Sequence, residues 1–208
     1  TLFTSRPVGD AMATTIWGTS SSWTLTALPL FVWMGEILFR TKLSENLFEG
    51  LSPWMQKLPG GLIHVNVVGC ALFAAISGSS AATVATVGKM SIPELRKRKY
   101  PEKILLGSLA GSGTLGLLIP PSIILIIYGV TVQESIAKLF VAGIIPGIMI
   151  ALIFMGYVII WSLFNKKDMP PIISEYTFIE KIKKSGQLIP VIILIVSVIG
   201  SIYTGIAT

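Results

Sequence analysis

Apolar residues fill five regions of the chain, and short polar segments separate them. The first region, residues 16–39, has a polar first half, which predicts a short helix from about residue 24. Residues 43–58 carry apolar side chains at helical spacing with glutamates between them, so we expect an amphipathic helix in the membrane interface. Residues 136–164 are long enough to cross a membrane, because a span needs about 20 residues for a core of about 30 Å. Residues 188–203 form the last apolar region.

The second apolar region, residues 61–92, is too long for one span and too short for two. Its two halves, residues 62–77 and 79–91, would form helices of about 24 and 20 Å. Small polar residues gather where these halves meet. We therefore expect a re-entrant helical hairpin with its tip inside the membrane, formed by Ser77, Gly78, Ser79 and Ser80.

The third apolar region is interrupted by the segment GSGTLGLLIPPS, residues 111–122. Glycines weaken a helix, and the two prolines cannot continue one from before. Proline is well placed, however, in the first turn of a new helix. The pattern predicts two half-helices, at about residues 103–112 and 120–129. Each would be about 15 Å long, which places the break near the midplane of the membrane.

Composition agrees with a membrane environment. The chain is 52% hydrophobic and only 12% charged, and its mean hydropathy is +0.79, whereas soluble domains are about 25% charged. We therefore expect an integral membrane protein whose net charge of +6 reports orientation and not nucleic-acid binding. The single cysteine, Cys70, lies in an apolar run and is interpreted as a buried, inert thiol. The chain starts without a signal peptide and ends without a polar tail, which suggests a fragment.

Basic residues define an orientation. If the hairpin returns to its own side, then residues 40–57, 89–103 and 165–184 share one side of the membrane and hold 14 of the 16 Lys and Arg. The positive-inside rule makes this side cytoplasmic. A single continuous span through residues 61–92 would instead divide the basic residues between both sides.

The two interruptions predict chemistry as well as shape. Non-helical backbone at membrane depth is tolerated only when it is buried in protein or lines a wet cavity, and such breaks are typical of secondary transporters. Carbonyl groups at both breaks, with the hydroxyls of Ser77, Ser80 and Thr114, would supply oxygen ligands for a hard cation. No Asp or Glu occurs between Lys57 and Glu94, so the predicted cation is monovalent.

A second ligand is predicted beside the cation. The N-termini of half-helices carry positive dipole ends that suit an anionic substrate group. Two such ends fall at residues 79–80 and 120–121. The candidate substrate-binding residues are Ser79, Thr83, Pro121 and Ser122.

Simpler and rival interpretations remain open for these residues. Helices rich in Gly, Ala, Ser and Thr also pack tightly with no ligand at all. A tip serine could be the nucleophile of an intramembrane serine protease, but the only histidine, His64, is 13 residues from Ser77, about 20 Å along a helix. We therefore expect a transporter and not an enzyme. His64 is interpreted as structural, and Glu36 as the partner of Arg40 in a helix-end ion pair.

The basic run RKRK, residues 96–99, is interpreted as a general cytoplasmic anchor and not as a lipid-specific site.

Longer stretches of the sequence resemble one family. They are LPLFVWMGEIL, PGGLIHVNVVGCALFAAISGSSAATVATVG, IPELRKRKY, GSLAGSGTLGLLIPPSIILIIYG and SIAKLFVAGIIPGIMIALIFMGY, and together they cover nearly all of residues 27–160. They resemble the large membrane subunit of TRAP transporters, the DctM-like family. The stretch IYTGIAT near the end resembles the point where that family enters its second repeat.

The resemblance implies a fold and an activity. The fold is all-α and membrane-integral, with transmembrane helices, one re-entrant hairpin and one broken helix: half of an inverted-repeat elevator transporter. The activity is sodium-coupled uptake of a carboxylate across the inner membrane of a bacterium or archaeon. A small TRAP membrane subunit and a soluble periplasmic binding protein are the implied partners. Sodium would be the coupling ion, with no other cofactor, and a sodium–dicarboxylate symporter that needs no binding protein is the alternative.

The resemblance also assigns residues. Carried over by motif, the first-repeat sodium site falls on Ser77, Gly78, Ser79, Ser80, Gly113, Thr114, Gly116 and Pro120. The second repeat, with its own hairpin, is expected to lie outside this sequence. The expected regions are an N-terminal span (1–42), an interfacial helix (43–59), a transport region with hairpin and broken helix (60–130), a full span (131–165), a cytoplasmic connector (166–187) and a span leading to the missing repeat (188–208).

Overall fold

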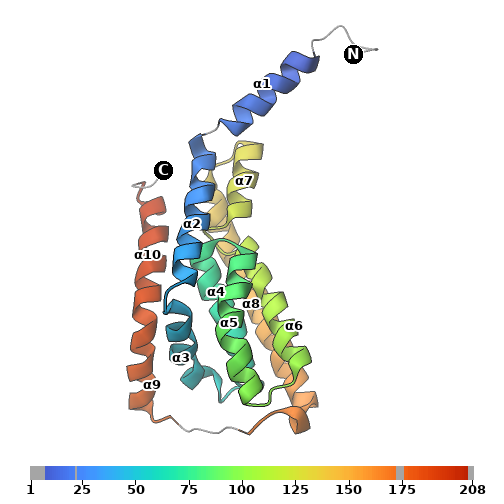
Figure 1. Ribbon diagram of the computed structural model, residues 1–208, viewed down its shortest axis with the longest axis vertical. Coiled ribbons are helices and arrows are strands. Elements are labelled where there is room, and N and C mark those ends of the chain that lie inside the picture. Colours follow the sequence, from blue (N-terminus) through green and yellow to red (C-terminus); the bar gives the residue numbers. More distant parts are fainter. Residues whose placement is uncertain (1–7, 22, 172–175, 206–208) are drawn as a thin grey trace.

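The protein is a bundle of α-helices (Figure 1), seen in a computed structural model that describes residues 8–21, 23–171 and 176–205. The α-helices are α1 (Val8–Ser20), α2 (Ala27–Phe39), α3 (Leu43–Met55), α4 (Ile63–Ser77), α5 (Ser80–Lys97), α6 (Glu102–Gly113), α7 (Ile123–Val132), α8 (Ile136–Phe164), α9 (Phe178–Ser185) and α10 (Ile189–Tyr203). The 3₁₀ helices are η1 (Trp23–Thr26), η2 (Thr114–Leu117), η3 (Lys166–Asp168) and η4 (Gly186–Leu188). The described residues contain no strand, so the expected all-α class is confirmed.

Helices α4 and α5 form a helical hairpin. The chain leaves the helix only at Gly78 and Ser79, within the predicted tip. The second arm is longer than expected, because α5 continues past Pro93 to Lys97. Leu95 is fully buried against Leu62 and Leu105, and this packing carries the helix beyond the proline. The insertion of the hairpin into a membrane stays a prediction.

The broken helix is made of α6, η2 and α7. Its first half matches the expected bounds closely, but its second half begins at Ile123 and not at residue 120 as predicted. Pro120 and Pro121 are buried in the unwound segment instead of starting the helix. Ser122 has extended backbone and forms the N-cap position of α7, while its hydroxyl donates to the Leu117 carbonyl oxygen over 2.6 Å.

The amphipathic helix α3 covers the base of the hairpin. Its apolar side chains Leu47, Phe48 and Leu51 are at most 7% exposed. Phe48 and Leu51 pack in one cluster with Leu62 and Leu105. This part of the apolar stripe is therefore covered by protein, whereas Trp54 and Leu58 are exposed. The place of α3 in the membrane interface stays a prediction.

Two long helices carry exposed apolar surface. Helix α8 and the nearly continuous helix Phe178–Tyr203 are long and apolar enough to cross a membrane, and most of each lies exposed on the bundle. The second of these begins ten residues before the predicted position, because the capping box of Thr177 and Glu180 starts a helix that continues through η4. Long, exposed apolar helices together with the composition make this an integral membrane protein.

The N-terminal region differs from the single predicted span. Helix α1 projects away from the bundle, and η1 separates it from α2 (Figure 1). At the end of α1 the Ser21 N–H and hydroxyl both donate to the Trp17 carbonyl oxygen, over 2.9 and 2.7 Å. The short helix expected from about residue 24 corresponds to η1 and α2.

The hairpin tip and the helix break lie between the two ends of α8 (Figure 1). The break contacts α8 at Gly143 and Gly147, which are 7 and 11 residues from its first residue. At 1.5 Å per residue these positions are roughly 10 and 16 Å into the long helix. Both interruptions therefore lie well inside the length of the longest apolar helix.

Candidate ion and substrate site

Gly78 brings the hairpin tip against the broken helix. It ends α4 with a left-handed φ of +60°, which glycine adopts without steric cost. A Cβ atom at this position would lie 2.6 Å from the Pro121 carbonyl oxygen. The Gly78 carbonyl oxygen accepts a hydrogen bond of 3.2 Å from the Ile123 N–H. The tip and the start of α7 are therefore joined backbone to backbone.

Gly116 makes a second close contact between the two interruptions. A Cβ atom on Gly116 would lie 2.9 Å from the Ser80 nitrogen and 3.0 Å from the Ser79 carbonyl carbon. Gly113, one turn earlier, approaches Val84 and the Ser80 carbonyl oxygen from α5. The glycines that interrupt the helix thus also allow it to reach the hairpin.

The tip hydroxyls are bonded to one another. Ser77 Oγ lies 3.0 Å from Thr83 Oγ1, and both side chains are fully buried. The Thr83 hydroxyl donates to the Ser79 carbonyl oxygen over 2.7 Å. Ser79 Oγ accepts from the Ala82 N–H over 3.4 Å, which is the N-cap bond that starts α5. These bonds hold the tip in one conformation.

The hydroxyl of Ser80 differs from its neighbours. It is buried and has no hydrogen-bond partner among the described residues. Its residue lies in the contact with Gly116 and Gly113. A buried polar group without a partner costs about 1–3 kcal/mol. An unsatisfied oxygen at the meeting point of two helix breaks is a position where a bound cation would remove that cost.

The remaining predicted residues are not all in this contact. Pro121 is buried against the tip, whereas Pro120 is buried against Gly143 of α8. The Thr114 side chain is exposed, and its hydroxyl donates to the Gly111 carbonyl oxygen over 2.7 Å. The structure therefore brings the tip, the break glycines and Pro121 together and leaves the Thr114 side chain outside the buried contact.

Glycines on neighbouring helices position the break, and our sequence reasoning did not single them out. A Cβ on Gly143 would lie 2.7 Å from the Leu118 carbonyl oxygen, and one on Gly147 would lie 2.9 Å from the Ile119 side chain. Gly35 of α2 lies less closely against the tip, since its Cβ position is 3.4 Å from the Ser77 Cβ, an ordinary van der Waals contact. The spacing of Gly143 and Gly147, four residues apart, was the available signal, since small residues at this spacing favour close helix packing in membranes.

Asn66 fixes the first hairpin arm to the first half-helix. Its Nδ2 donates to the Leu105 carbonyl oxygen over 3.3 Å and to Ser108 Oγ over 3.1 Å. The Ser112 hydroxyl donates to the Ser108 carbonyl oxygen over 2.6 Å and lies 3.4 Å from the Asn66 carbonyl oxygen. These buried bonds hold α4 and α6 together below the tip.

The other polar candidates lie away from the tip. His64 is fully buried at the opposite end of α4, where its Nε2 lies 2.7 Å from the Pro59 carbonyl oxygen. Glu36 and Arg40 form the predicted ion pair, with 2.8 Å between Oε1 and Nη2, and both side chains are exposed. Neither His64 nor Glu36 is part of the contact between the breaks.

The junction offers oxygen atoms as possible ligands for an ion. The described residues contain no cluster of three or more His, Cys, Asp and Glu side chains. The polar groups at the junction are hydroxyl and carbonyl oxygens, with glycines that admit a close approach of backbone. The monovalent cation expected from the sequence stays a prediction.

The fold and the junction define a class of protein. A helical hairpin that meets a broken helix inside an apolar bundle is the arrangement of a membrane transporter. Comparison with known proteins is more specific: residues 1–208 match the family described as the tripartite ATP-independent periplasmic transporter, DctM component. The chain belongs to this family, and it is therefore a TRAP transporter component and not an enzyme.

Several characterised relatives are similar over most of the chain. The C4-dicarboxylate TRAP transporter large permease protein of Pseudomonas aeruginosa is 36% identical over 94% of the chain and 45% of that protein. The isethionate TRAP transporter permease protein of Oleidesulfovibrio alaskensis is 34% identical over 98% of the chain and 32% of that protein. The ectoine/5-hydroxyectoine large permease protein of Ruegeria pomeroyi is 33% identical over 88% of the chain and 42% of that protein. The chain thus spans less than half the length of each.

Proposed function

We propose that the chain supplies the first half of a sodium-coupled TRAP transporter that takes up a carboxylate delivered by a soluble binding protein. Its membrane partner would be the small TRAP subunit, and its location the inner membrane of a prokaryote. The observation that carries the sodium part is the buried, unpartnered Ser80 hydroxyl where the hairpin tip meets the broken helix. Backbone carbonyls and the Ser77 hydroxyl would complete this half of the ion site.

The substrate would lie beside the ion. Ser79 and Ser122 are the N-cap residues of α5 and α7, and the bond between Gly78 and Ile123 holds these two helix starts together. Two converging helix N-termini favour an anionic group. The substrates in the relatives' names differ from one another, so we propose a carboxylate on the strength of this geometry and the family.

The tip–break junction also supports transport by movement of one rigid unit. Asn66 and Ser112 bind α4 to α6, and the tip binds to the start of α7. An ion held between hairpin and broken helix would then move with both. The exposed Thr114 side chain is proposed to complete the ion site only in the full-length protein.

The test is uptake by proteoliposomes that contain the full-length large subunit and the small subunit. We expect uptake of a radiolabelled carboxylate only with an inward sodium gradient and with the binding protein outside. Equal uptake with potassium in place of sodium would refute sodium coupling. Sodium-driven uptake without the binding protein would instead support the binding-protein-independent symporter.

A further inference from the structure

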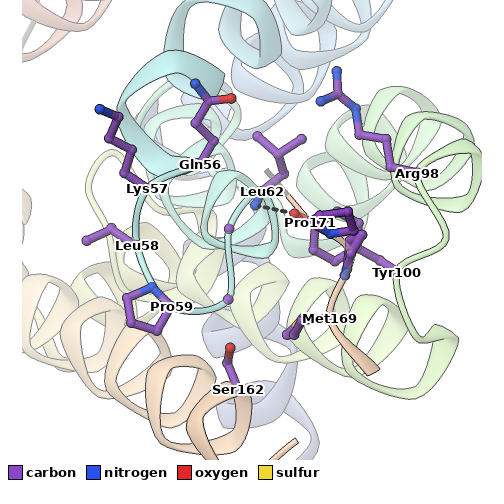
Figure 2. Close-up of a pocket in the computed structure, with 13 residues that line it drawn as sticks. Gln56, Lys57, Leu58, Pro59, Leu62, Arg98, Tyr100, Ser162, Met169 and Pro171 are labelled. Carbon is purple, nitrogen blue, oxygen red and sulfur yellow. Dashed lines mark hydrogen bonds between the residues drawn. The ribbon is translucent and has the colours of Figure 1, made fainter. Parts of the chain in front are cut away.

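A basic hollow lies at the base of the hairpin, at the end of the bundle away from the α7–α8 turn (Figure 1 and Figure 2). Its volume is about 250 Å³, and its walls come from three parts of the chain: residues 56–62, the α5–α6 turn, and the end of α8 with the segment after it. The hollow is far from the tip, at the opposite end of α4.

Two basic side chains flank this hollow. Figure 2 shows Lys57 and Arg98 on opposite sides of Gln56 and Leu62. Nε and Nη2 of Arg98 both lie 2.7 Å from Glu94 Oε1, which holds the guanidinium in place. A guanidinium has five N–H groups, so the ion pair leaves donors for a second acceptor. Lys57 is exposed and lines the hollow.

Tyr100 adds a neutral donor to the wall. Its hydroxyl oxygen accepts a hydrogen bond of 3.1 Å from the Leu62 N–H, drawn as the dashed line in Figure 2. Burial raises the pKa of Tyr100, although this hydrogen bond and Arg98 act in the opposite direction. The phenol therefore keeps its proton at neutral pH and can donate it to an anion.

A second hollow of about 370 Å³ shares Arg98 and Met169 with the first. Its other charged residues are Lys97, Lys99, Lys167 and Asp168. Basic side chains thus outnumber acidic ones around the joined hollows even when the pairing of Arg98 with Glu94 is counted. An unbalanced basic concavity attracts anions.

The walls are apolar as well as basic, and this favours a phospholipid over a small soluble anion as the ligand. Leu58, Leu62 and Met169 line the first hollow together with prolines. Ser162, on the last turn of α8, also lines it, and the adjacent Leu163 and Phe164 are 49% and 86% exposed. A small soluble anion needs no such surface, whereas a phospholipid presents a phosphate beside acyl chains.

We propose that the joined hollows bind the phosphate headgroup of an anionic phospholipid, with its acyl chains along the exposed end of α8. Lys57, Arg98 and Tyr100 would contact the phosphate. Residues 97–99 of the basic run, interpreted from sequence as a general anchor, would then form one wall of a specific site. The bound lipid would connect the hairpin base with α8. The proposal uses no feature of ion or substrate binding, so it stands or falls separately from the proposed function.

The experiment is native mass spectrometry of the full-length large subunit with the small subunit, released from nanodiscs of phosphatidylglycerol and phosphatidylcholine. We expect retained phosphatidylglycerol on the wild type and about tenfold less on the double variant Lys57→Gln/Arg98→Gln, because charge-assisted hydrogen bonds are lost. The matched control, Lys138→Gln/Lys183→Gln, removes the same charge elsewhere and should retain lipid. Glu94→Gln removes the acidic partner of Arg98, and this variant should retain at least as much phosphatidylglycerol as the wild type.

Two results would overturn the proposal directly: equal retention of phosphatidylglycerol by the two double variants, or equal retention of phosphatidylcholine by the wild type. Complete displacement of the lipid by an excess of inorganic phosphate would also overturn it, because it would assign the site to free phosphate. Should the Arg98 change prevent folding, Lys57→Gln alone keeps the Arg98–Glu94 pair. That variant should retain roughly threefold less phosphatidylglycerol than Lys183→Gln, and equal retention would count against the site.

Discussion

Single glycines determine how closely the two helix breaks approach. At Gly78 two independent constraints coincide: a left-handed φ and a Cβ position 2.6 Å from the Pro121 carbonyl oxygen. Gly107, on α6, has nothing within 4 Å of its Cβ position. Gly78 is therefore required by a tertiary contact, whereas Gly107 is merely tolerated in its helix.

We expect Gly78→Ala to lower the free energy of unfolding by about 2–4 kcal/mol, because strain at positive φ adds to overpacking. Gly107→Ala should be neutral or stabilise by about 0.5–1 kcal/mol, as alanine favours a helix. Denaturant titration of the purified full-length subunit measures both. Equal stability of the two variants would show that the tip does not rest on the Pro121 carbonyl.

The Ser80 hydroxyl is the residue-scale test of the ion site. Ser80→Ala should raise the sodium concentration for half-maximal uptake about fivefold, since the loss of one contact of about 1 kcal/mol weakens binding by that factor. Without sodium it should keep or raise the free energy of unfolding, by up to about 1–3 kcal/mol, because a buried hydroxyl without a partner is removed. Thr131→Ala removes an exposed hydroxyl that bonds only its own helix and serves as the control. Unchanged sodium dependence in Ser80→Ala would make Ser80 a packing residue.

At the scale of elements, the broken helix is shaped by α8. Gly143 and Gly147 give the unwound segment 118–120 room to lie against the long helix. An unwound segment lacks the full set of helical hydrogen bonds, so it depends on neighbours that exclude lipid. The packing of α8 is therefore part of the site even though α8 supplies no predicted ligand.

We expect Gly143→Ala to reduce both stability and uptake, because its Cβ would lie 2.7 Å from the Leu118 carbonyl oxygen and displace the break. The cost should be about 1–3 kcal/mol, typical of overpacking. Gly156→Ala on the same helix meets nothing within 4 Å and should match the wild type. Thermal unfolding and sodium-driven uptake measure the two effects, and wild-type behaviour of Gly143→Ala would remove α8 from this role.

At the scale of the whole molecule, the two ends of the bundle differ in charge. The α5–α6 turn and the end of α8 lie at one end, and the α7–α8 turn lies at the other (Figure 1). The described parts of the predicted basic loops, residues 96–99, 166–171 and 176–184, therefore lie at a single end, as the positive-inside rule requires; residues 172–175 lie outside the described part of the chain. The orientation of that end toward the cytoplasm stays a prediction.

Cysteine labelling in spheroplasts tests this orientation. Both variants are made in a Cys70→Ala background. We expect Glu134→Cys to react with a membrane-impermeant maleimide, and Lys99→Cys to react only after permeabilisation. The reason is that both side chains are exposed but lie at opposite ends of the bundle. Total labelling in detergent controls for reactivity. Labelling of both positions in intact spheroplasts would contradict the hairpin topology.

The sequence by itself determined the class of the protein and the place of both interruptions. Apolar composition indicates a membrane environment, and the small polar residues at positions 77–80 and the glycines with prolines at 111–122 disfavour a continuous helix. Its motifs also determined the family, because residues 1–208 match the DctM component. These features are local in the chain, so they can be read without coordinates.

Only the tertiary structure decided how these interruptions meet. Helix α7 starts at Ile123 and not at residue 120 because the two prolines are buried against α8 and the hairpin tip. Helix α5 passes Pro93 because Leu95 is buried. The isolated Ser80 hydroxyl, the exposed Thr114 side chain and the basic hollow each depend on contacts between segments far apart in sequence. Local propensity cannot specify such contacts, since packing decides which polar group finds a partner and which does not.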